Sequence, residues 1–404
     1  MLGQRIRTLR KQKKLTLEAL AGDQLTKGML SLIENEKSKP SMESLTYLAE
    51  RLDVTVSELL DTEDKQKLQA VLDEVEGYIP GGRYLHITHP EKIKKAIEEV
   101  LPSIGTSYES ARLLHLYAFA LESVNDQTWQ SYIKRAATLY ENMNMVHPRV
   151  KIALFKSGIL FEKQSYRDSL ELFLEERRII EDFFPRIDTL SLIDLHYHEA
   201  LLYYAVGEYD KAIDITESAL HLSQESHIFY RTDDFYRLAA THTLFMKGNT
   251  LTNKYIFKLK KYGELTDYKF AVEFYEFLNV ASLIKREQFE EARNFISEYE
   301  SNKDPLLLPW FLKEKGRLYY LNSDFEQASK ILSEVNFPEY LTHPMDLALI
   351  YEVDVILARC HLHLGNVEKA REYAKKAEEI YAPLPESVFK DFMRDTLRLV
   401  EEQT

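Results

Sequence analysis

Several histidines carry side chains that could support chemistry, but their spacing argues against it. His196 and His198, followed by Glu199, form an HxHE run, and His361 and His363 repeat the spacing. Residues two apart lie on nearly opposite faces of a helix, so neither pair can place both imidazoles on one metal ion. The sequence also lacks the phosphate-loop, dinucleotide-binding, zinc-protease, nucleophile-elbow and CxxC motifs. We therefore predict no enzyme, no metal site and no cofactor.

A second set of side chains, near the N-terminus, could contact nucleic acid. Leu17 to Ala21 predicts a short helix, Gly22-Asp23-Gln24 a turn, and Thr26 is placed to cap a further helix that ends near Glu34. Two helices joined by a tight turn form a helix-turn-helix. Its second helix packs inward through Leu30 and leaves the opposite face for a DNA major groove. The residues expected to contact DNA are Thr26, Lys27, Gly28, Ser31, Asn35 and Lys39.

The first 61 residues resemble the Xre (lambda-repressor-like) helix-turn-helix family. The resemblance rests on LxLRKQKKLT and on LxxLT-K-xxLSxIENxKxxPSxxxLxxLAxxLxVxxxELL, with Glu36 standing where the family usually has Gly. It implies a DNA-reading helical bundle in which Arg10 and Glu34 brace the first helix against the reading helix.

Charge is distributed unevenly along the 404 residues. Residues 1–40 hold nine Lys or Arg and four acids, whereas the whole chain has a net charge of -13. A basic head on an acidic body is expected when only the head contacts phosphate. The scarcity of Gly (13) and Pro (12) predicts an all-α chain. No apolar run is long enough to span a membrane and no signal peptide is evident, so we expect a cytoplasmic protein in which the lone Cys360 is a buried thiol.

The remaining sequence predicts a linker followed by helical repeats. Residues 62–90 form the linker, with a helix that ends at Glu76 and a Pro80-Gly81-Gly82 turn. Residues 91–404 contain about seven hairpins of tetratricopeptide type, with aligned small positions 36 to 43 residues apart, and a C-terminal capping helix. Such hairpins stack into a right-handed superhelix with a concave inner surface. The clearest second helices are Gly207 to Leu220, Glu287 to Tyr299, Ser323 to Val335 and Gly365 to Ile380, and weaker copies lie at Leu114 to Tyr140, Leu154 to Arg178 and Phe235 to Lys260.

A concave surface lined by cations and aromatic rings would suit a short peptide. Taking Ala200, Thr241, Val280, Gly316 and Ala358 as the eighth repeat positions places several such side chains on it. An Arg there can hold a carboxylate through two hydrogen bonds. The alternative is that these cations pair with Glu314 and Glu352 on adjacent repeats. The candidate peptide-binding residues are Tyr197, Tyr204, His242, Asn279, Trp310, Lys313, Arg317, Tyr320 and Arg359.

The combination of an Xre-type head, a helical linker and repeats of about 40 residues resembles the RRNPP group of peptide-pheromone regulators of Gram-positive bacteria. The resemblance implies a transcriptional regulator that binds a DNA operator as a homodimer or higher homo-oligomer and senses a short signalling peptide in quorum sensing. The family binds the peptide backbone through Asn residues of the groove, and Asn279 is the candidate for that role here. The alternative function is a protein-interaction module whose repeats bind and inhibit a signalling protein such as a response regulator. Arg10 and Glu34, both present, favour the DNA-binding interpretation.

Overall fold

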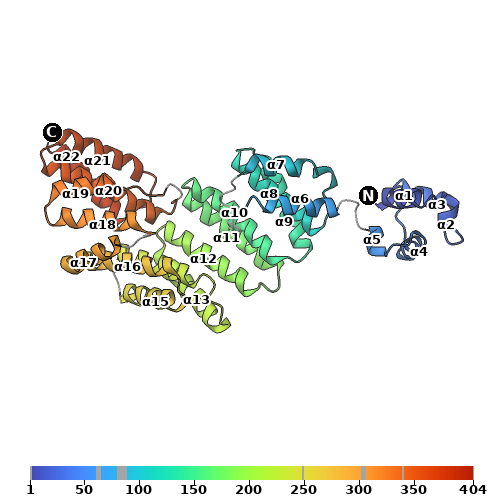
Figure 1. Cartoon of the computed structure of the whole chain (residues 1–404), viewed down its shortest axis with the longest axis horizontal. Helices are drawn as coiled ribbons and strands as arrows, with labels where there is room; N and C mark the ends of the chain where they lie inside the picture. The colour runs from blue at the N-terminus through green and yellow to red at the C-terminus, as the bar shows by residue number, and fades with distance from the viewer. Residues whose placement is uncertain are drawn as a thin grey trace. The chain divides into compact units, whose positions relative to one another are not determined.

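Every regular element of the described chain is a helix (Figure 1). The computed structural model describes residues 2–60, 65–79, 89–247, 250–301, 306–338 and 341–403. The predicted Pro80-Gly81-Gly82 turn lies outside these ranges. The chain divides into two compact units, Met1–Ile152 and Ala153–Thr404. The all-α prediction is confirmed.

Residues 2–60 form a bundle of five helices, called here the N-terminal bundle. They are α1 (Leu2–Gln12), α2 (Leu17–Ala21), α3 (Lys27–Glu34), α4 (Met42–Leu52) and α5 (Val56–Leu60). Its core contains fully buried Ile6, Leu20, Leu30 and Leu48. The bundle therefore has a hydrophobic core of its own.

Local chemistry sets the ends of these helices. The hydroxyls of Thr16, Thr26 and Ser41 each accept a hydrogen bond from the backbone N–H three residues on, as N-caps do. Glu36, which lies just after α3, has a left-handed backbone conformation with a φ of 58°. The predicted cap at Thr26 is thus confirmed, and Glu36 adopts the conformation that usually favours Gly.

The first helix lies unusually close to the end of α3. A Cβ added at Gly3 would lie 2.2 Å from the carbonyl oxygen of Ile33. Arg10 donates to both carboxylate oxygens of Glu34, at 2.6 and 2.8 Å. The predicted brace between α1 and α3 is therefore present, and the missing side chain at Gly3 allows the approach.

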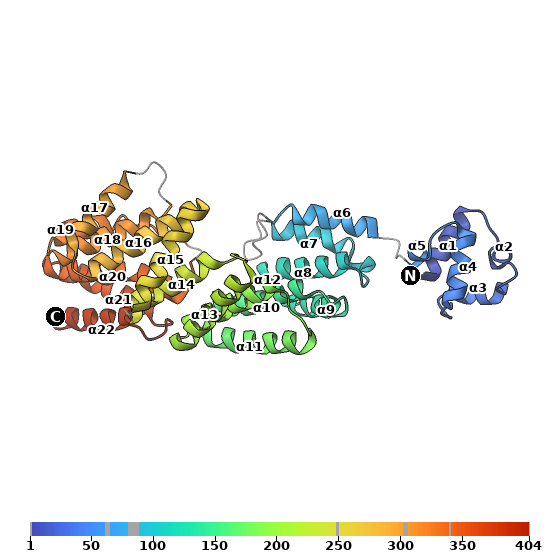
Figure 2. The same cartoon turned by 90° about the horizontal axis from the view of Figure 1, so that it is seen from below.

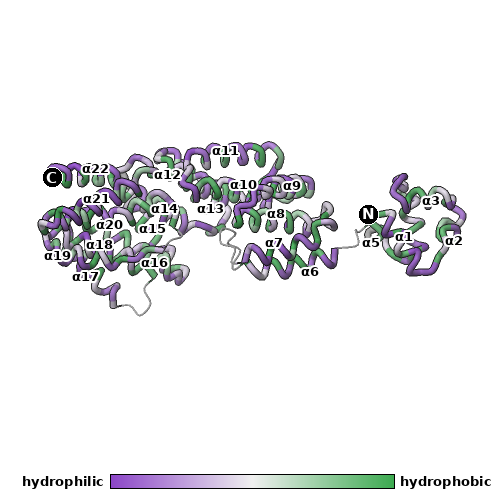
Figure 3. The backbone as a smooth tube through the Cα atoms, turned by 90° about the horizontal axis from the view of Figure 1, so that it is seen from above, coloured by the Kyte–Doolittle hydropathy of each residue, from purple (hydrophilic) through white to green (hydrophobic). Residues whose placement is uncertain are grey.

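The first unit also contains α6 (Lys65–Glu76), α7 (Pro90–Glu98), α8 (Tyr108–Ser123) and α9 (Trp129–Asn142), a short 3-10 turn at Leu101–Ser103 and the beginning of the next helix. The apolar residues Leu68, Leu72 and Val75 of α6 are buried, and Arg112 on α8 donates to Glu76 at 2.8 Å. Figure 3 shows hydrophobic and hydrophilic residues alternating along α6 and α7. Because α6 packs against α7 and α8, it belongs to the helical body, and its assignment to a linker is corrected.

Helices α8 to α21 are arranged as seven consecutive hairpins, as predicted. Six of these pairs have extensive contacts, and α10 meets α11 through a hydrogen bond between the Ser157 and Ser169 hydroxyls. After α8 and α9, the bounds are α10 (Val146–Glu162), α11 (Tyr166–Phe183), α12 (Thr189–Ala205), α13 (Tyr209–Ser226), α14 (Thr232–His242), a π-turn at Thr243–Lys247, α15 (Thr250–Thr266), α16 (Lys269–Lys285), α17 (Phe289–Glu300), α18 (Leu308–Leu321), α19 (Phe325–Leu332), α20 (Pro344–His363) and α21 (Val367–Tyr381).

Small residues allow the two helices of a hairpin to approach. A Cβ at Gly316 on α18 would lie 2.5 Å from the Leu332 side chain on α19. Ala212, Ala328 and Ala370 are fully buried on the second helices. The small position of the first hairpin was aligned at Gln130, which is exposed, so that alignment is wrong. The buried residues of α9 are Ile133, Ala136, Leu139 and Tyr140.

The alignment of the fourth hairpin is also corrected. Asn253, the position aligned with Ala212 and Ala328, is exposed, whereas Tyr255 and Leu259 are fully buried on α15. The π-turn at Thr243–Lys247 lies between α14 and α15 and changes the spacing that a regular repeat would give. An assignment of residues to repeat positions that assumes regular α-helices fails where the backbone is not α-helical.

Within the second unit, the last hairpin returns to the earlier ones. Tyr166 donates through its hydroxyl to the Thr342 carbonyl at 3.0 Å, and the His242 and His343 rings lie 5.2 Å apart. The terminal helix α22 (Val388–Glu401) packs against α20 and α21, as Figures 1 and 2 show. The predicted C-terminal capping helix is present.

Candidate functional sites: a solvent-facing helix and a basic cavity

Helix α3 presents an exposed face that no other part of the N-terminal bundle covers. Lys27 and Gly28 are exposed, and Met29 and Leu32 keep 49% and 46% of their surface. Leu30 and Ile33 are buried beneath them. Two large apolar side chains at the surface, beside a cation, suit contact with thymine methyl groups and phosphates in a major groove.

The predicted DNA-contacting residues, on α3 and beside it, fall into two groups, and the first is exposed lysines. Lys27 forms an exposed ion pair with Glu18, with 2.6 Å between nitrogen and oxygen. Lys39 is exposed as well. An exposed pair of this kind contributes little and is easily exchanged for phosphate.

The other predicted residues are partly engaged within α3. Thr26 caps the helix, and the Asn35 side-chain amide donates to the Ser31 carbonyl at 2.8 Å. Asn35 therefore ends α3, and this bond uses one of the two N–H donors of its side-chain amide. Gly28 faces open space, since a Cβ there would meet only the Thr26 hydroxyl, at 3.9 Å.

The second site is a cavity of about 430 Å³ in the second unit, called here the basic cavity. The inner helices α16, α18 and α20, the π-turn and α22 provide its walls. Two cations and one carboxylate are among its residues. It is lined by Phe245, Ala281, Lys285, Arg317, Tyr320, Leu321, Glu352, Ile356, Val388, Phe389 and Phe392.

The structure brings two predicted peptide-binding residues, Arg317 and Tyr320, into this cavity. The Arg317 guanidinium lies 3.3 Å from the Glu314 carboxylate and 3.9 Å from that of Glu352. Its side chain is 24% exposed, so it is reachable. These two ion pairs are the arrangement that the alternative interpretation of the groove cations anticipated.

Lys313 cannot serve as a groove cation, which corrects the prediction. It is fully buried and forms ion pairs with Glu314, at 2.8 Å, and with Glu352. Burial favours the neutral form of Glu314, but Lys313 and Arg317 outweigh it and lower the pKa of that carboxyl. Lys313 is part of the internal ion cluster between α18 and α20.

Arg359 is likewise occupied, because it fastens the C-terminal helix. Its guanidinium lies 4.2 Å from the centre of the Phe392 ring, and its Nε donates to the Thr396 hydroxyl at 2.7 Å. The face of an aromatic ring attracts a cation that lies over it. The prediction that Arg359 contacts peptide is therefore corrected: it holds α22.

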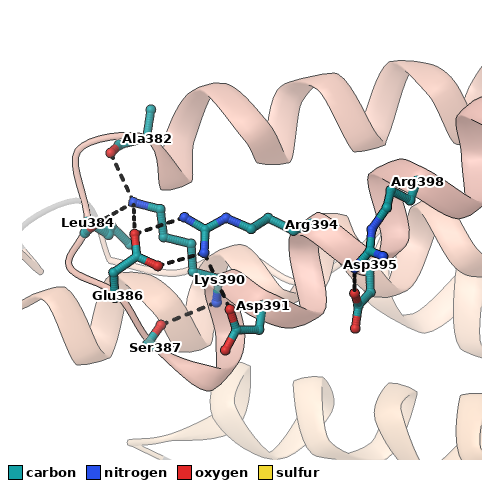
Figure 4. Close-up of polar contacts among 9 residues, drawn as sticks. All are labelled: Ala382, Leu384, Glu386, Ser387, Lys390, Asp391, Arg394, Asp395 and Arg398. Atoms are coloured by element: carbon teal, nitrogen blue, oxygen red, sulfur yellow. Dashed lines mark hydrogen bonds and ion pairs between the residues drawn. The ribbon is translucent and has the colours of Figure 1, made fainter.

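The N-terminus of α22 is also anchored (Figure 4). Glu386 accepts two hydrogen bonds from Arg394, at 2.6 and 2.8 Å, and Ser387 caps the helix at the N–H of Lys390. The Lys390 amine donates to the Leu384 carbonyl at 2.7 Å. These contacts fix the helix that provides one wall of the basic cavity.

Two further predicted residues are buried in an aromatic cluster. Tyr204 stacks on His242 with ring centres 4.2 Å apart, and the two are 2% and 4% exposed. Burial holds the pKa of His242 well below its ordinary value. Both side chains line a small pocket of about 20 Å³ with Tyr209, Met345 and Phe389 and do not line the basic cavity, so a peptide contact at these residues stays a prediction.

The other predicted residues are partly exposed on inner helices. The Tyr197 ring packs against Phe235 and lies beneath the Arg231 guanidinium, at 4.6 Å. Trp310 packs against Phe277 and Phe337. Asn279 lies on α16 and is half-buried. None of the three is among the residues that line the basic cavity.

Sequence reasoning missed Lys285 and the two phenylalanines of α22. Lys285 is the last residue of α16, beyond the repeat positions that were assigned to the groove. Phe389 and Phe392 were assigned to a capping helix, and only its return onto α20 makes them cavity walls. Met29 was also missed as an exposed residue of α3. Its position three residues after the N-cap Thr26 places it in the first turn of that helix.

Neither a metal site nor a membrane span is found in the part of the chain that the structure describes. No three His, Cys, Asp or Glu side chains there come together as a metal ion requires. No helix in the same ranges combines the length and the apolar content that crossing a bilayer demands.

Comparison with known proteins gives one domain family and several solved structures. Residues 3–65 match the family described as "Helix-turn-helix domain". No curated protein matches the chain. The N-terminal bundle is thus a helix-turn-helix domain by sequence as well as by fold.

Three of the solved structures that match the chain have 16 to 18% sequence identity to it. PlcR of Bacillus thuringiensis, in complex with the peptide PapR7 and DNA, is 16% identical, with 72% of this chain and 98% of that chain covered and a TM-score of 0.34. NprR in complex with its cognate peptide NprX is 17% identical, covering 78% and 84%, with a TM-score of 0.47. ComR of S. thermophilus, with DNA and its signalling peptide ComS, is 18% identical, covering 70% and 99%, with a TM-score of 0.32.

Proposed function

We propose that this protein is a DNA-binding transcriptional regulator whose helical repeats bind a short signalling peptide that alters operator binding. The observation that carries the proposal is the exposed face of α3, with Lys27, Met29 and Leu32 at the surface of a bundle that matches a helix-turn-helix family. A capped helix with an uncovered face and one easily released cation is suited to a major groove.

The basic cavity supports the peptide-binding half of the proposal. It is formed on inner helices of the repeats and combines apolar walls with reachable cations, as ligand sites do. Peptide-binding PlcR, NprR and ComR are the kind of regulator that the proposal describes. For switching, the peptide must bind the DNA-competent and DNA-incompetent arrangements with different affinities.

The DNA-binding half is tested on the full chain with a selection from random duplexes, followed by gel shifts on the selected sequence. Lys27→Ala should weaken specific binding by about 1–3 kcal/mol if Lys27 contacts a base edge. Lys369→Ala, which removes an exposed cation from α21, is the matched control and should leave affinity unchanged.

Two outcomes would count against this proposal. Equal affinity of the Lys27→Ala and wild-type proteins would remove Lys27 from the interface. Failure to select any duplex would overturn DNA binding and favour the protein-interaction alternative, in which the repeats bind a signalling protein.

A further inference from the structure

The charges around the basic cavity do not balance. Lys285, Lys313 and Arg317 supply three cations, and Glu314 and Glu352 supply two carboxylates. Both carboxylates already contact Lys313 and Arg317. One positive charge at this site therefore lacks an anionic partner among the described residues.

The surplus charge is on Lys285. Its amine donates to the Leu244 carbonyl at 2.6 Å, and that neutral oxygen is the one acceptor the described residues give it. Burial, followed by the nearby positive charge of Arg317, lowers the pKa of Lys285. An anion bound between the two cations would favour the charged form of both.

The remaining walls are apolar and aromatic. Phe245 comes from the π-turn, Ile356 from α20, and Phe389 and Phe392 from α22. A volume of about 430 Å³ lies within the range of small-ligand sites. The cavity thus offers a position for one anion next to a position for an apolar side chain.

We propose that the basic cavity binds the C-terminal residue of a short peptide. The free carboxylate lies between Lys285 and Arg317, and a large apolar side chain packs against Phe245, Ile356 and Phe389. This inference rests on the proposed peptide-binding function and adds which end of the peptide is recognised and which residue stands there.

The carboxylate at a chain end fits this cavity better than an internal Asp or Glu does. A terminal residue carries its carboxylate and its apolar side chain on the same Cα, so both reach one small site. An internal acidic residue would bring polar backbone past the apolar walls on both sides, where the peptide groups would lose water without a partner.

The test uses the full-length protein and two pools of short random peptides that end in Phe or Leu, one made as free acids and one as C-terminal amides. Peptides retained by the protein are identified by mass spectrometry. The strongest is then measured by calorimetry in both forms. We expect the acid to bind at least about tenfold more tightly than its amide, because charge-assisted hydrogen bonds to the carboxylate are lost in the amide.

Variants locate the effect. Lys285→Met keeps the aliphatic length and removes the charge, and it should reduce the preference for the acid to about twofold or less. Lys315→Met is the control, because Lys315 lies on α18 but pairs with Glu300 instead of entering the cavity. A second variant, Lys285→Gln, and an unchanged circular dichroism spectrum guard against a folding defect.

The outcomes separate this inference from the proposed function. Tight binding of acid and amide with equal affinity would overturn recognition of the C-terminus and leave the peptide sensor in place. An acid preference that survives in Lys285→Met would also overturn the assignment. Retention of no peptide from either pool would overturn the peptide-binding function as well.

Discussion

Burial decides what each ion pair of the N-terminal bundle does. The side chains of Arg10 and Glu34 are 11% and 4% exposed, whereas those of Lys27 and Glu18 are 60% and 66% exposed. A buried pair that loses one partner leaves a charge without water or counterion, and an exposed pair does not. Arg10 is therefore structural, and Lys27 is available to another partner.

Removal of Arg10 should loosen the N-terminal bundle. Arg10→Met leaves the Glu34 carboxylate buried without its two donors, which we expect to cost about 3 kcal/mol. Amide hydrogen exchange across α1 to α4 measures the loss. Lys13→Met, which removes a pair with Asp53 at 3.5 Å in which both partners are exposed, is the control and should change exchange little. Equal effects of the two variants would contradict the structural role of Arg10.

The buried histidines of the second unit predict a loss of stability in acid. Burial lowers the pKa of His343 to about 4, well below the roughly 6.5 of an unfolded chain. Between these pH values the unfolded state binds a proton that the folded state does not, so stability falls as pH falls. The expected contribution of His343 is about 1.4 kcal/mol per pH unit.

His343→Asn tests this expectation by denaturant unfolding between pH 7 and 4 (about three units). Asn keeps a side-chain acceptor for the N–H of Met345 and so preserves the cap of α20. The slope of stability against pH should flatten. Asp346→Asn should steepen it, because burial raises the pKa of Asp346 to about 6, which favours the folded state in acid. Parallel slopes in the wild type and His343→Asn would contradict the prediction.

At the scale of elements, α22 has two roles. Its inward face contributes Phe389 and Met393 to the core, and its Val388, Phe389 and Phe392 also line the basic cavity. The Arg359 contact and the capped N-terminus hold it in this position. The strength of its attachment therefore affects the shape of the ligand site.

Loss of the N-cap should loosen α22 selectively. Ser387→Ala removes the hydroxyl that accepts from the N–H of Lys390, at a cost of about 1 kcal/mol. Hydrogen exchange should accelerate in α22 and stay unchanged in α19. Arg398→Ala removes an exposed pair with Asp395 on the same helix and is the control. Acceleration throughout the second unit would mean that α22 does not open separately.

At the scale of the whole molecule, a single reading helix limits what the N-terminal bundle can recognise. One α3 covers a half-site, and a two-fold operator requires two such helices about one helical turn of DNA apart. The basic N-terminal residues and the acidic remainder favour phosphate contact by the bundle. DNA recognition thus calls for two chains.

We therefore expect the 47.4 kDa chain to sediment as a dimer or a larger assembly on a selected two-half-site duplex. Analytical ultracentrifugation of the full chain, alone and with DNA, provides the measurement. A duplex with one half-site destroyed should bind more weakly and is the control. A monomer in both samples would contradict the expectation.

The sequence by itself determined the features that depend on neighbours in the chain. The N-cap at Thr26, apolar spacing in the helices and small residues such as Ala212 and Ala328 act over a few positions, so the pattern predicts helices, the helix-turn-helix and seven hairpins. The Arg10–Glu34 pair was predicted because the family resemblance places the two residues together.

Only the tertiary structure decided which inner side chains are reachable. One position along a helix turns a side chain by about 100°, so a small error of register moves a cation from the groove into the core. Lys313 is buried between Glu314 and Glu352, whereas Lys285 lines the cavity. The π-turn shifts the repeat spacing, and the return of α22 covers Arg359 and adds Phe389 as a wall. These contacts join residues far apart in sequence, and local patterns carry no signal for them.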